Sequence, residues 1–405
     1  MMSLRDLLSS DVQSFIHQHE NDDVKQLVLK HKLIHGIPSN IIADQLNGRR
    51  KAKEKLSFLY ETKGIVYPPG VNVEQSSSEQ TARYKAAIFS QQDSELKNKS
   101  LVDLTGGFGV DGYFFSKVFK GVHYVEPNEN LLEISKHNHQ QFSANNIYYH
   151  NTTAEEFLAS HKYPFDIAYI DPSRRAAGNQ KVYSLNNCEP NIIQLQEVIF
   201  AKADCLLIKV SPLFDIQQGL KELKFVQQVF IVSVDNECKE VLFLCVKNFT
   251  GEPKIVASNI LAGNRIDSFS FMFSTERSVE ASFSEPLSYL YEPNASILKA
   301  GAFKTIGNEF KISKLHPSTH LYTSEHLIEN FPGRIFKVET FVKADPKTLK
   351  DFFPEGKANI TTRNYPLSVE ELKKKTGLKD GGDKFLIGFS GSNTKFLVVA
   401  NHVRL

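Results

Sequence analysis

The stretch Asp103-Leu104-Thr105-Gly106-Gly107-Phe108-Gly109-Val110-Asp111 decides the fold of this chain. The apolar run 101–104 predicts a short buried strand, and residues 113–119 have the pattern of an amphipathic helix. The glycines between them allow backbone angles, and a close approach by a ligand, that a Cβ would block. A strand, a glycine-rich turn and a helix N-terminus together predict a nucleotide-binding crevice in an α/β protein.

Two features of this loop limit the ligand. No Gly-Lys-Ser/Thr sequence follows the glycines, so the loop is not a P-loop for nucleoside triphosphates. Asp103 precedes the glycines, and an acidic residue in that place favours a ligand that carries a positive charge. A glycine-rich turn by itself also occurs in α/β proteins of other functions, so the assignment depends on the motifs that follow.

Glu126 is the second informative residue. Residues 122–126 predict the next strand, and Glu126 ends it about 20 residues after the glycine turn, the distance expected for a ribose-binding carboxylate. A carboxylate there can accept hydrogen bonds from both hydroxyls of an adenosine ribose. The segment 128–141 then predicts a second helix.

The third motif is Asp171-Pro172, at the end of the apolar run 165–170. Parallel strands place their carboxyl ends at one edge of a sheet, where the ligands of open α/β folds bind. By itself, Asp-Pro is also a common way to start a turn. Its position in register with the other two motifs favours a place in the binding site.

The order of the three motifs resembles that of class I S-adenosylmethionine-dependent methyltransferases. The closest resemblance is to the branch with [DN]PP[YF]-like motifs, which methylates exocyclic amino groups of nucleobases. Further segments extend the similarity over nearly the whole chain to a bacterial, Bacteroidetes-type family of these enzymes with a C-terminal THUMP-like domain. The segments are 67–85, 187–190, 208–212, 233–240, 357–368 and 380–383.

The resemblance implies S-adenosylmethionine as cofactor and a role for each motif. Asp171 and Pro172 become the catalytic residues, because their oxygens can accept the hydrogens of an amine and aim its lone pair at the methyl group. Asp111 either contacts the cofactor or caps the following helix. Thr153 occupies the position from which relatives read the adenine. The implied cofactor-binding residues are Asp103, Thr105, Gly106, Gly107, Gly109, Asp111, Glu126 and Thr153.

The sequence departs from the amino-methylating pattern directly after Asp171-Pro172. Ser173 and Arg174 stand where a second proline and a stacking aromatic ring are usual. Arg174 or Arg175 can instead stack on a base or bind a phosphate. Tyr183 or Phe214 can supply the ring.

Composition is that of a water-soluble protein of several domains. Of the 405 residues, 41% are hydrophobic and 23% charged, and no apolar run approaches the length of a membrane span. The four cysteines form no CxxC pair, so we expect free thiols in a reducing cytoplasm and no metal site.

Changes in pattern along the chain predict a mixed architecture. We expect a doubly wound, Rossmann-like α/β sheet with helices before it and α+β modules after it. The resemblance implies the identities of the parts: a helical region at 1–66, the methyltransferase domain at 67–250, a linker with a small ferredoxin-like element at 251–320 and a THUMP-like RNA-binding domain at 321–405. Within the second, residues 229–234 and 241–246 predict an antiparallel pair that closes the sheet.

The charge distribution fits RNA as a partner, and the THUMP-like resemblance favours this interpretation over a purely structural one. Residues 331–405 contain 14 Lys and Arg against 8 Asp and Glu, a net of +6 in a chain whose total is +2. Such a basic module suits RNA phosphates, and we expect Lys373 and Lys374 to contact them. The same lysines are also typical of a solvent-exposed helix, because positive side chains near the C-terminus of a helix interact favourably with its dipole.

Three functions therefore compete. The first is methylation of an exocyclic amine in rRNA or tRNA. The second keeps the cofactor but acts on a protein or a small molecule. The third is an RNA-binding module without activity, which the presence of Asp103, Glu126 and Asp171 together disfavours.

Overall fold

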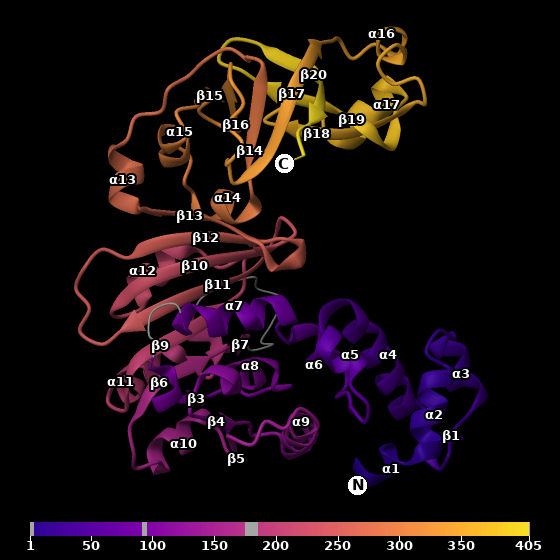
Figure 1. Cartoon of the computed structure of the whole chain (residues 1–405), viewed down its shortest axis with the longest axis vertical. Helices are drawn as coiled ribbons and strands as arrows, with labels where there is room; N and C mark the ends of the chain where they lie inside the picture. The colour runs from indigo at the N-terminus through magenta and orange to yellow at the C-terminus, as the bar shows by residue number, and fades with distance from the viewer. Residues whose placement is uncertain (1–3, 91–94, 175–184, 405) are drawn as a thin grey trace. The chain divides into compact units, whose positions relative to one another are not determined.

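The fold was analysed in a computed structural model that describes residues 4–90, 95–174 and 185–404. Tight contacts divide the chain into two compact units. Unit 1 comprises Met1–Gln227 and Glu240–Gly251, and unit 2 comprises Gln228–Lys239 and Glu252–Leu405. Figure 1 shows the order of the elements along the chain.

The N-terminal region is mainly helical, as its sequence pattern predicts, but it also contains a small hairpin. Positive φ angles at His35 and Gly36 form the turn of the hairpin. The helices bury Val12, Ile16 and Leu46 in a core of their own. The elements are α1 (Leu4–Leu7), α2 (Ser10–Gln18), α3 (Val24–Lys30), β1 (Leu33–Ile34), β2 (Ile37–Pro38), α4 (Ser39–Lys55) and α5 (Ser57–Glu61).

A nine-stranded mixed sheet follows the N-terminal helices, with the strand order β13-β12-β10-β11-β9-β6-β3-β4-β5. The five strands β9, β6, β3, β4 and β5 are parallel to one another, so their carboxyl ends lie at one edge. The strands are β3 (Ser100–Asp103), β4 (Gly121–Val125), β5 (Ile147–His150), β6 (Phe165–Ile170), β9 (Ala203–Val210), β10 (Val226–Val234), β11 (Glu237–Val246), β12 (Lys254–Ile260) and β13 (Ile266–Met272).

Helices alternate with these strands, and a short two-stranded ladder follows Asp171-Pro172. The helix α8 packs on α7 and on β4, and α11 packs on β9. The elements are α6 (Gly70–Gln75), α7 (Glu79–Ser90), α8 (Val110–Val118), α9 (Glu129–Gln141), α10 (Ala154–Ser160), β7 (Ser173–Arg174), β8 (Cys188–Glu189), α11 (Ile192–Phe200) and α12 (Ile216–Glu222).

A seven-stranded sheet occupies the C-terminal part, with the order β15-β16-β14-β17-β20-β19-β18. Two clusters of buried side chains pack on it, one containing Phe336 and Phe389 and the other Leu349 and Leu372. The elements are α13 (Phe273–Ser278), β14 (Tyr289–Pro293), α14 (Ala295–Ala300), α15 (Thr305–Glu309), β15 (Ser313–His316), β16 (Thr319–Ser324), β17 (Gly333–Phe341), α16 (Pro346–Lys350), β18 (Lys357–Arg363), α17 (Val369–Thr376), β19 (Lys379–Ser390) and β20 (Lys395–His402).

The predicted fold class is confirmed, with one correction at the end of the first sheet. The strands β10 and β11 lie where the sequence predicts a pair, but they do not close the sheet, because β12 and β13 extend it beyond β10. The prediction failed because the pattern of a strand does not specify which strand pairs with it. Here β12 pairs with β10 in parallel, and the chain between them, which includes β11, makes the connection.

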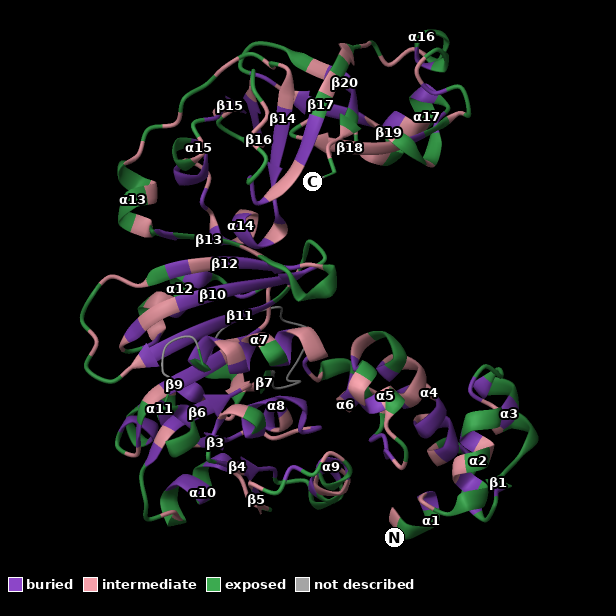
Figure 2. Cartoon of the chain, in the orientation of Figure 1, coloured by how far each residue is buried: buried purple, intermediate pink, exposed green. Residues whose placement is uncertain are grey.

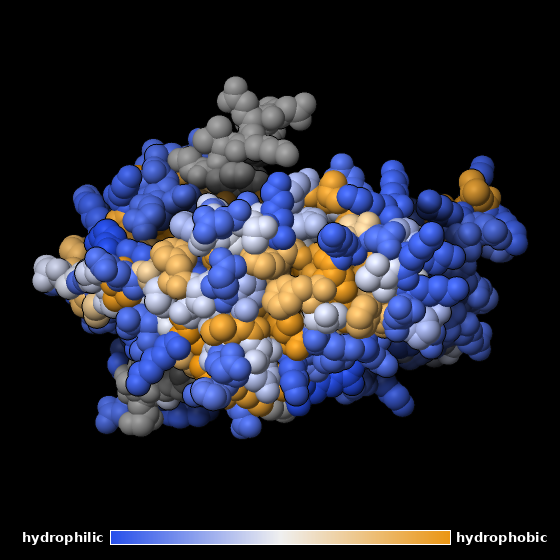
Figure 3. Space-filling model, turned by 90° about the horizontal axis from the view of Figure 1, so that it is seen from above, coloured by the Kyte–Doolittle hydropathy of each residue, from blue (hydrophilic) through white to orange (hydrophobic). Residues whose placement is uncertain are grey.

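Burial follows the strands of both sheets (Figure 2). The face in Figure 3 is largely hydrophilic, with apolar residues gathered near its middle. All four cysteines remain thiols rather than disulfides. Over the described residues, every helix is too short or too polar to cross a membrane.

Two buried amides hold the extended segment that enters the methyltransferase region. Asn138, on α9, accepts from the Val66 N–H at 3.0 Å and donates to its carbonyl at 2.8 Å. Gln45 makes the same pair of contacts with Tyr67, at 2.9 and 2.6 Å. The backbone groups of Val66 and Tyr67 therefore form their hydrogen bonds with side chains, in place of the bonds that a neighbouring β-strand would provide.

We expect Asn138→Ala to lower the free energy of unfolding by about 2–4 kcal/mol, because it leaves two buried backbone groups of Val66 without partners. Urea denaturation measures the loss. The matched control is Gln141→Ala, at an exposed position near the end of the same helix. A loss for Asn138→Ala below about 0.5 kcal/mol, like that of a surface change, would contradict the structural role.

Candidate functional site

The glycine loop connects β3 to α8 at the carboxyl edge of the first sheet. Gly107 and Gly109 have φ angles of +60° and +80°, which side chains with a Cβ rarely adopt. Gly106 is required for a different reason, since a Cβ there would lie 2.4 Å from the Tyr124 ring. A Cβ at Gly109 would likewise lie 2.7 Å from the His139 ring, so Gly106 and Gly109 also allow these side chains to pack against the loop.

A second layer of side chains holds the loop from behind. The Tyr124 hydroxyl donates to the Gly107 carbonyl at 2.5 Å, and His139 Nε2 donates to the Gly109 carbonyl at 2.8 Å. The Tyr149 hydroxyl lies 2.9 Å from His139 Nδ1, which must accept if Nε2 carries the proton. Burial lowers the pKa of His139 to about 4, so this imidazole is neutral at physiological pH.

Glu126 directly follows β4, as predicted, and is buried. Its carboxylate accepts the Gly107 N–H at 2.9 Å and the Asn128 N–H at 2.8 Å. Burial raises the pKa of this carboxyl, and the two N–H groups partly oppose the rise. Glu126 therefore fixes the glycine loop, in addition to any contact with a ligand.

Asp103 has an incomplete set of hydrogen bonds. One carboxylate oxygen accepts the Thr105 N–H at 3.1 Å, whereas the other is buried without a hydrogen-bond partner among the described residues. Burial and the nearby carboxylates of Asp111, Asp171 and Glu126 raise the pKa of Asp103 well above its usual range. A cation placed beside it would relieve this repulsion.

Asp111 does not cap the following helix, so that alternative is wrong. The N-cap is Gly109, and Asp111 lies in the first turn of α8 with its side chain turned to buried partners. The hydroxyls of Ser77 and Tyr169 donate to it at 2.7 and 2.8 Å, and the Lys85 ammonium lies 3.2 Å away. Burial alone would raise its pKa, but Lys85 and Lys209 outweigh that effect and lower it.

Thr105 connects the loop after β3 to the Asp171-Pro172 motif. Its hydroxyl accepts the Asp171 N–H at 2.7 Å, so the end of β6 is tied to the loop after β3. The Asp171 side chain is about one-third exposed, at 32%. Asp171 therefore lies at the same sheet edge as Asp103, as the motif order predicts.

Two lysines and one glutamate complete the site, and sequence reasoning gave them no role. Lys209, on β9, forms an ion pair with Asp171. Lys85, on α7, is fully buried and contacts both carboxylate oxygens of Glu240 at 2.9 Å. The sequence did contain a signal for two of these residues, because each is a charged residue next to an apolar run. Lys209 follows the run 206–208, and Glu240 precedes the run 241–246.

The remaining predicted positions are partly described. Thr153 follows β5, where its hydroxyl accepts the Glu156 N–H at 3.2 Å in a capping box of α10. Arg174 pairs with Cys188 in the short β7–β8 ladder. Phe214 is buried, so it does not supply an exposed ring. Arg175 and Tyr183 lie outside the described residues.

The basic residues of the C-terminal part are already engaged to different degrees. Lys373 forms ion pairs with Glu370 and Asp380, whereas Lys374 is exposed on α17. Arg363, in a segment that supported the resemblance, binds the buried Glu292. A capping box at the start of α17 supports the interpretation of this segment as a stable charged helix.

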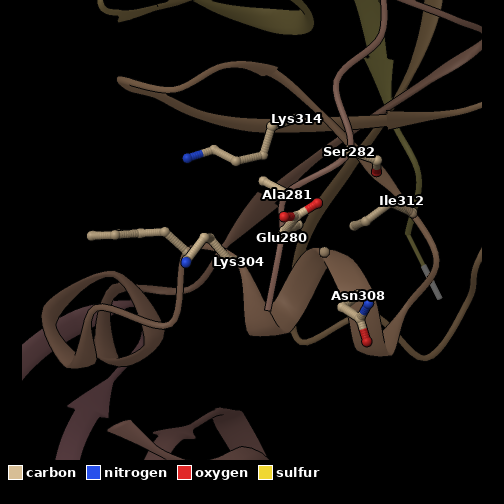
Figure 4. A pocket seen from close by; sticks show the side chains of 9 residues that line it. Glu280, Ala281, Ser282, Lys304, Asn308, Ile312 and Lys314 are labelled. Carbon is tan, nitrogen blue, oxygen red and sulfur yellow. The ribbon is translucent and has the colours of Figure 1, made fainter. Parts of the chain in front are cut away.

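A small pocket lies elsewhere, in unit 2, and Figure 4 shows the side chains that line it. Lys304 and Lys314 border it, but their ammonium groups donate to the Arg277 and Pro317 carbonyls at 3.0 and 2.9 Å. Glu280 adds a carboxylate to the same wall. This mixture of charges gives no reason to assign a ligand to the pocket.

Comparison with known proteins identifies the C-terminal modules. Residues 289–332 match a ferredoxin-like domain, and residues 333–401 match a THUMP domain-like family. A candidate methyltransferase from Porphyromonas gingivalis W83 is similar in structure over 100% of both chains, with 28% sequence identity and a TM-score of 0.85. This chain is a relative of that protein. It shares its methyltransferase-like fold, and it carries ferredoxin-like and THUMP-like domains at its C-terminal end.

Similarity to other solved structures is confined to part of the chain. A candidate RNA methyltransferase from Pyrococcus horikoshii covers 47% of this chain and 95% of its own, with 15% identity and a TM-score of 0.34. A candidate methyltransferase from Streptococcus mutans, in complex with SAH, covers 38% and 96%, with 16% identity and a TM-score of 0.29. These scores are too low to support an inference. No curated protein sequence matches the chain.

We expect the free energy of unfolding to fall as the pH drops from about 6.5 to about 4, with His139 contributing about 3 kcal/mol. The folded pKa lies below the unfolded one, so in this window the unfolded chain binds more protons. Urea denaturation at several pH values measures the effect, which should be smaller in His139→Gln. The control is His31→Gln, at an exposed position. Identical pH profiles for wild type and His139→Gln would contradict the assignment.

Proposed function

We propose that this protein is an S-adenosylmethionine-dependent methyltransferase that acts on RNA. The observation that carries the proposal is the group of carboxylates at the carboxyl edge of the first sheet, where Asp103 and Glu126 lie with the glycine loop near Asp171. Asp103 has a buried oxygen without a partner, and its pKa is raised by burial and neighbouring carboxylates. A ligand with both a sulfonium and an ammonium group would supply the missing positive charge.

The residues present fit this cofactor. Asp103 would face its charged methionine part, and Glu126 would accept the ribose hydroxyls next to the Gly107 N–H. Thr153 and its neighbours after β5 remain the predicted contacts for adenine. When bound, S-adenosylmethionine supplies a methyl group on a positively charged sulfur. The chain itself positions the two reactants and excludes water.

RNA is the acceptor class that the C-terminal module supports. The THUMP-like match and the net charge of +6 over residues 331–405 both favour contacts with phosphates. Within RNA, the resemblance of Asp171-Pro172 to amino-methylating motifs supports an exocyclic amine of a base in rRNA or tRNA. A protein or small-molecule acceptor would give the basic C-terminal module no role. An inactive RNA-binding module would give the acidic site no role.

We expect Glu126→Ala to weaken binding of S-adenosylmethionine at least tenfold, about 1.4 kcal/mol, because the variant loses an acceptor for the ribose and its hold on the Gly107 N–H. Isothermal titration calorimetry measures the affinity. Glu129→Ala, an exposed change in the first turn of α9, is the control and should bind normally. Normal binding by a folded Glu126→Ala would refute the site, and no binding by wild type would refute the cofactor.

We expect the double variant Lys374→Gln, Lys375→Gln to bind a transfer RNA pool more weakly, because both lysines are exposed on α17. If each contacts one phosphate, the slope of log affinity against log salt should fall by about 1.4–1.8. Filter binding at several salt concentrations tests this. Lys224→Gln removes an exposed lysine of unit 1 and serves as control. An unchanged slope would show that α17 does not contact RNA.

A further inference from the structure

Two lysines and three carboxylates form a set of opposite charges at the carboxyl edge of the first sheet, three of them buried inside the protein. The contacts run from Asp171 to Lys209 and, separately, from Glu240 to Lys85 and on to Asp111. They come from four elements and the end of a fifth: α7, α8, β9, β11 and the residue after β6. Lys85, Asp111 and Glu240 are buried, and the Lys209 side chain is only 12% exposed. Burying charged groups is costly, so an arrangement of this kind indicates a chemical use.

Lys209 is protonated in this setting. Burial by itself would lower its pKa, but the carboxylates of Asp171, Glu240 and Asp111 raise it above the usual value. Its side chain is 12% exposed, and that of its partner Asp171 is 32% exposed. A ligand that reaches Asp171 therefore meets a carboxylate with a permanent positive charge directly behind it.

This charge distinguishes between two kinds of acceptor. An exocyclic amine develops positive charge on nitrogen as it attacks a methyl group, and an adjacent ammonium opposes that change. A hydroxyl group instead passes its proton to a base and develops negative charge on oxygen, which an ammonium stabilises. Lys209 thus favours a hydroxyl.

We infer that the reacting group is a hydroxyl, the ribose 2′-hydroxyl of RNA, and that Asp171 and Lys209 act on it as a pair. The inference rests on the proposed function for its methyl donor and its polymer, and it replaces the exocyclic amine that the motif resemblance alone favours. The hydroxyl donates to Asp171, and its oxygen lone pair forms the new O–C bond. The S–C bond of the donor breaks with its electron pair staying on sulfur, and the proton passes to Asp171 and then to solvent. Lys209 stabilises the charge on oxygen and holds Asp171 in place.

Lys85 has a positioning role in this scheme. It neutralises Glu240 and Asp111, and Asp111 in turn accepts from the Tyr169 hydroxyl on β6, two residues before Asp171. Lys85 therefore helps to hold the end of β6, from which the chain continues to Asp171.

The test uses the full chain, S-adenosylmethionine with a labelled methyl group and total RNA from a strain that lacks the gene. Alkaline hydrolysis and mass spectrometry of the nucleosides locate the label. Label in 2′-O-methylnucleosides, within alkali-resistant dinucleotides, supports the inference. Label in a methylated base overturns the inference and leaves the proposed function standing. Label in neither, with the donor bound, overturns both the RNA acceptor and the inference. Failure to bind the donor overturns the proposed function itself.

A variant pair tests the role of Lys209. We expect Lys209→Met to lower methyl transfer at saturating donor at least a hundredfold while the donor affinity changes less than about threefold. The control Lys224→Met, at an exposed lysine paired with Glu197, should transfer normally. Normal transfer by Lys209→Met would overturn the role of the pair. Equal losses of donor binding and transfer would place Lys209 on the cofactor side and overturn it as well.

Discussion

The pairing of buried carboxylates with two ammonium groups, Lys85 and Lys209, is the interaction on which the site depends. Asp111, Glu240 and Asp171 approach one another at the carboxyl edge of the first sheet, where their mutual repulsion would otherwise favour protonation or exposure. Lys85 is fully buried against two of them, and Lys209 lies against the third. Removing either lysine would leave uncompensated charge in the interior, so the arrangement also constrains the fold.

Asp103 is the exception in this scheme. It lies near the same carboxylates, but one of its oxygens has no partner within the described chain. The lysines therefore neutralise Asp111, Glu240 and Asp171, while Asp103 retains a deficit of positive charge nearby. Under the proposed function, a cationic ligand removes that deficit, so the same cluster of acids serves both the fold and the binding site.

The glycine loop shows a similar division of tasks. Gly106 makes room for the ring of Tyr124. The carbonyl groups of Gly107 and Gly109 accept hydrogen bonds from Tyr124 and His139. Glu126 holds the loop from the other side through the Gly107 N–H. The loop is consequently shaped before any ligand arrives, and pre-organisation of this kind reduces the entropy that binding must overcome.

The sequence by itself determined the local features. Apolar runs and turn residues predicted the strands β3, β4 and β6 and the order of Asp103, Glu126 and Asp171, because these depend on neighbours along the chain. The tertiary structure alone decided the pairing of Asp171 with Lys209, and of Lys85 with Glu240 across 155 positions. It also turned Asp111 away from the helix cap and extended the first sheet by β12 and β13. Side-chain contacts between distant strands depend on register and burial, which a local pattern does not encode.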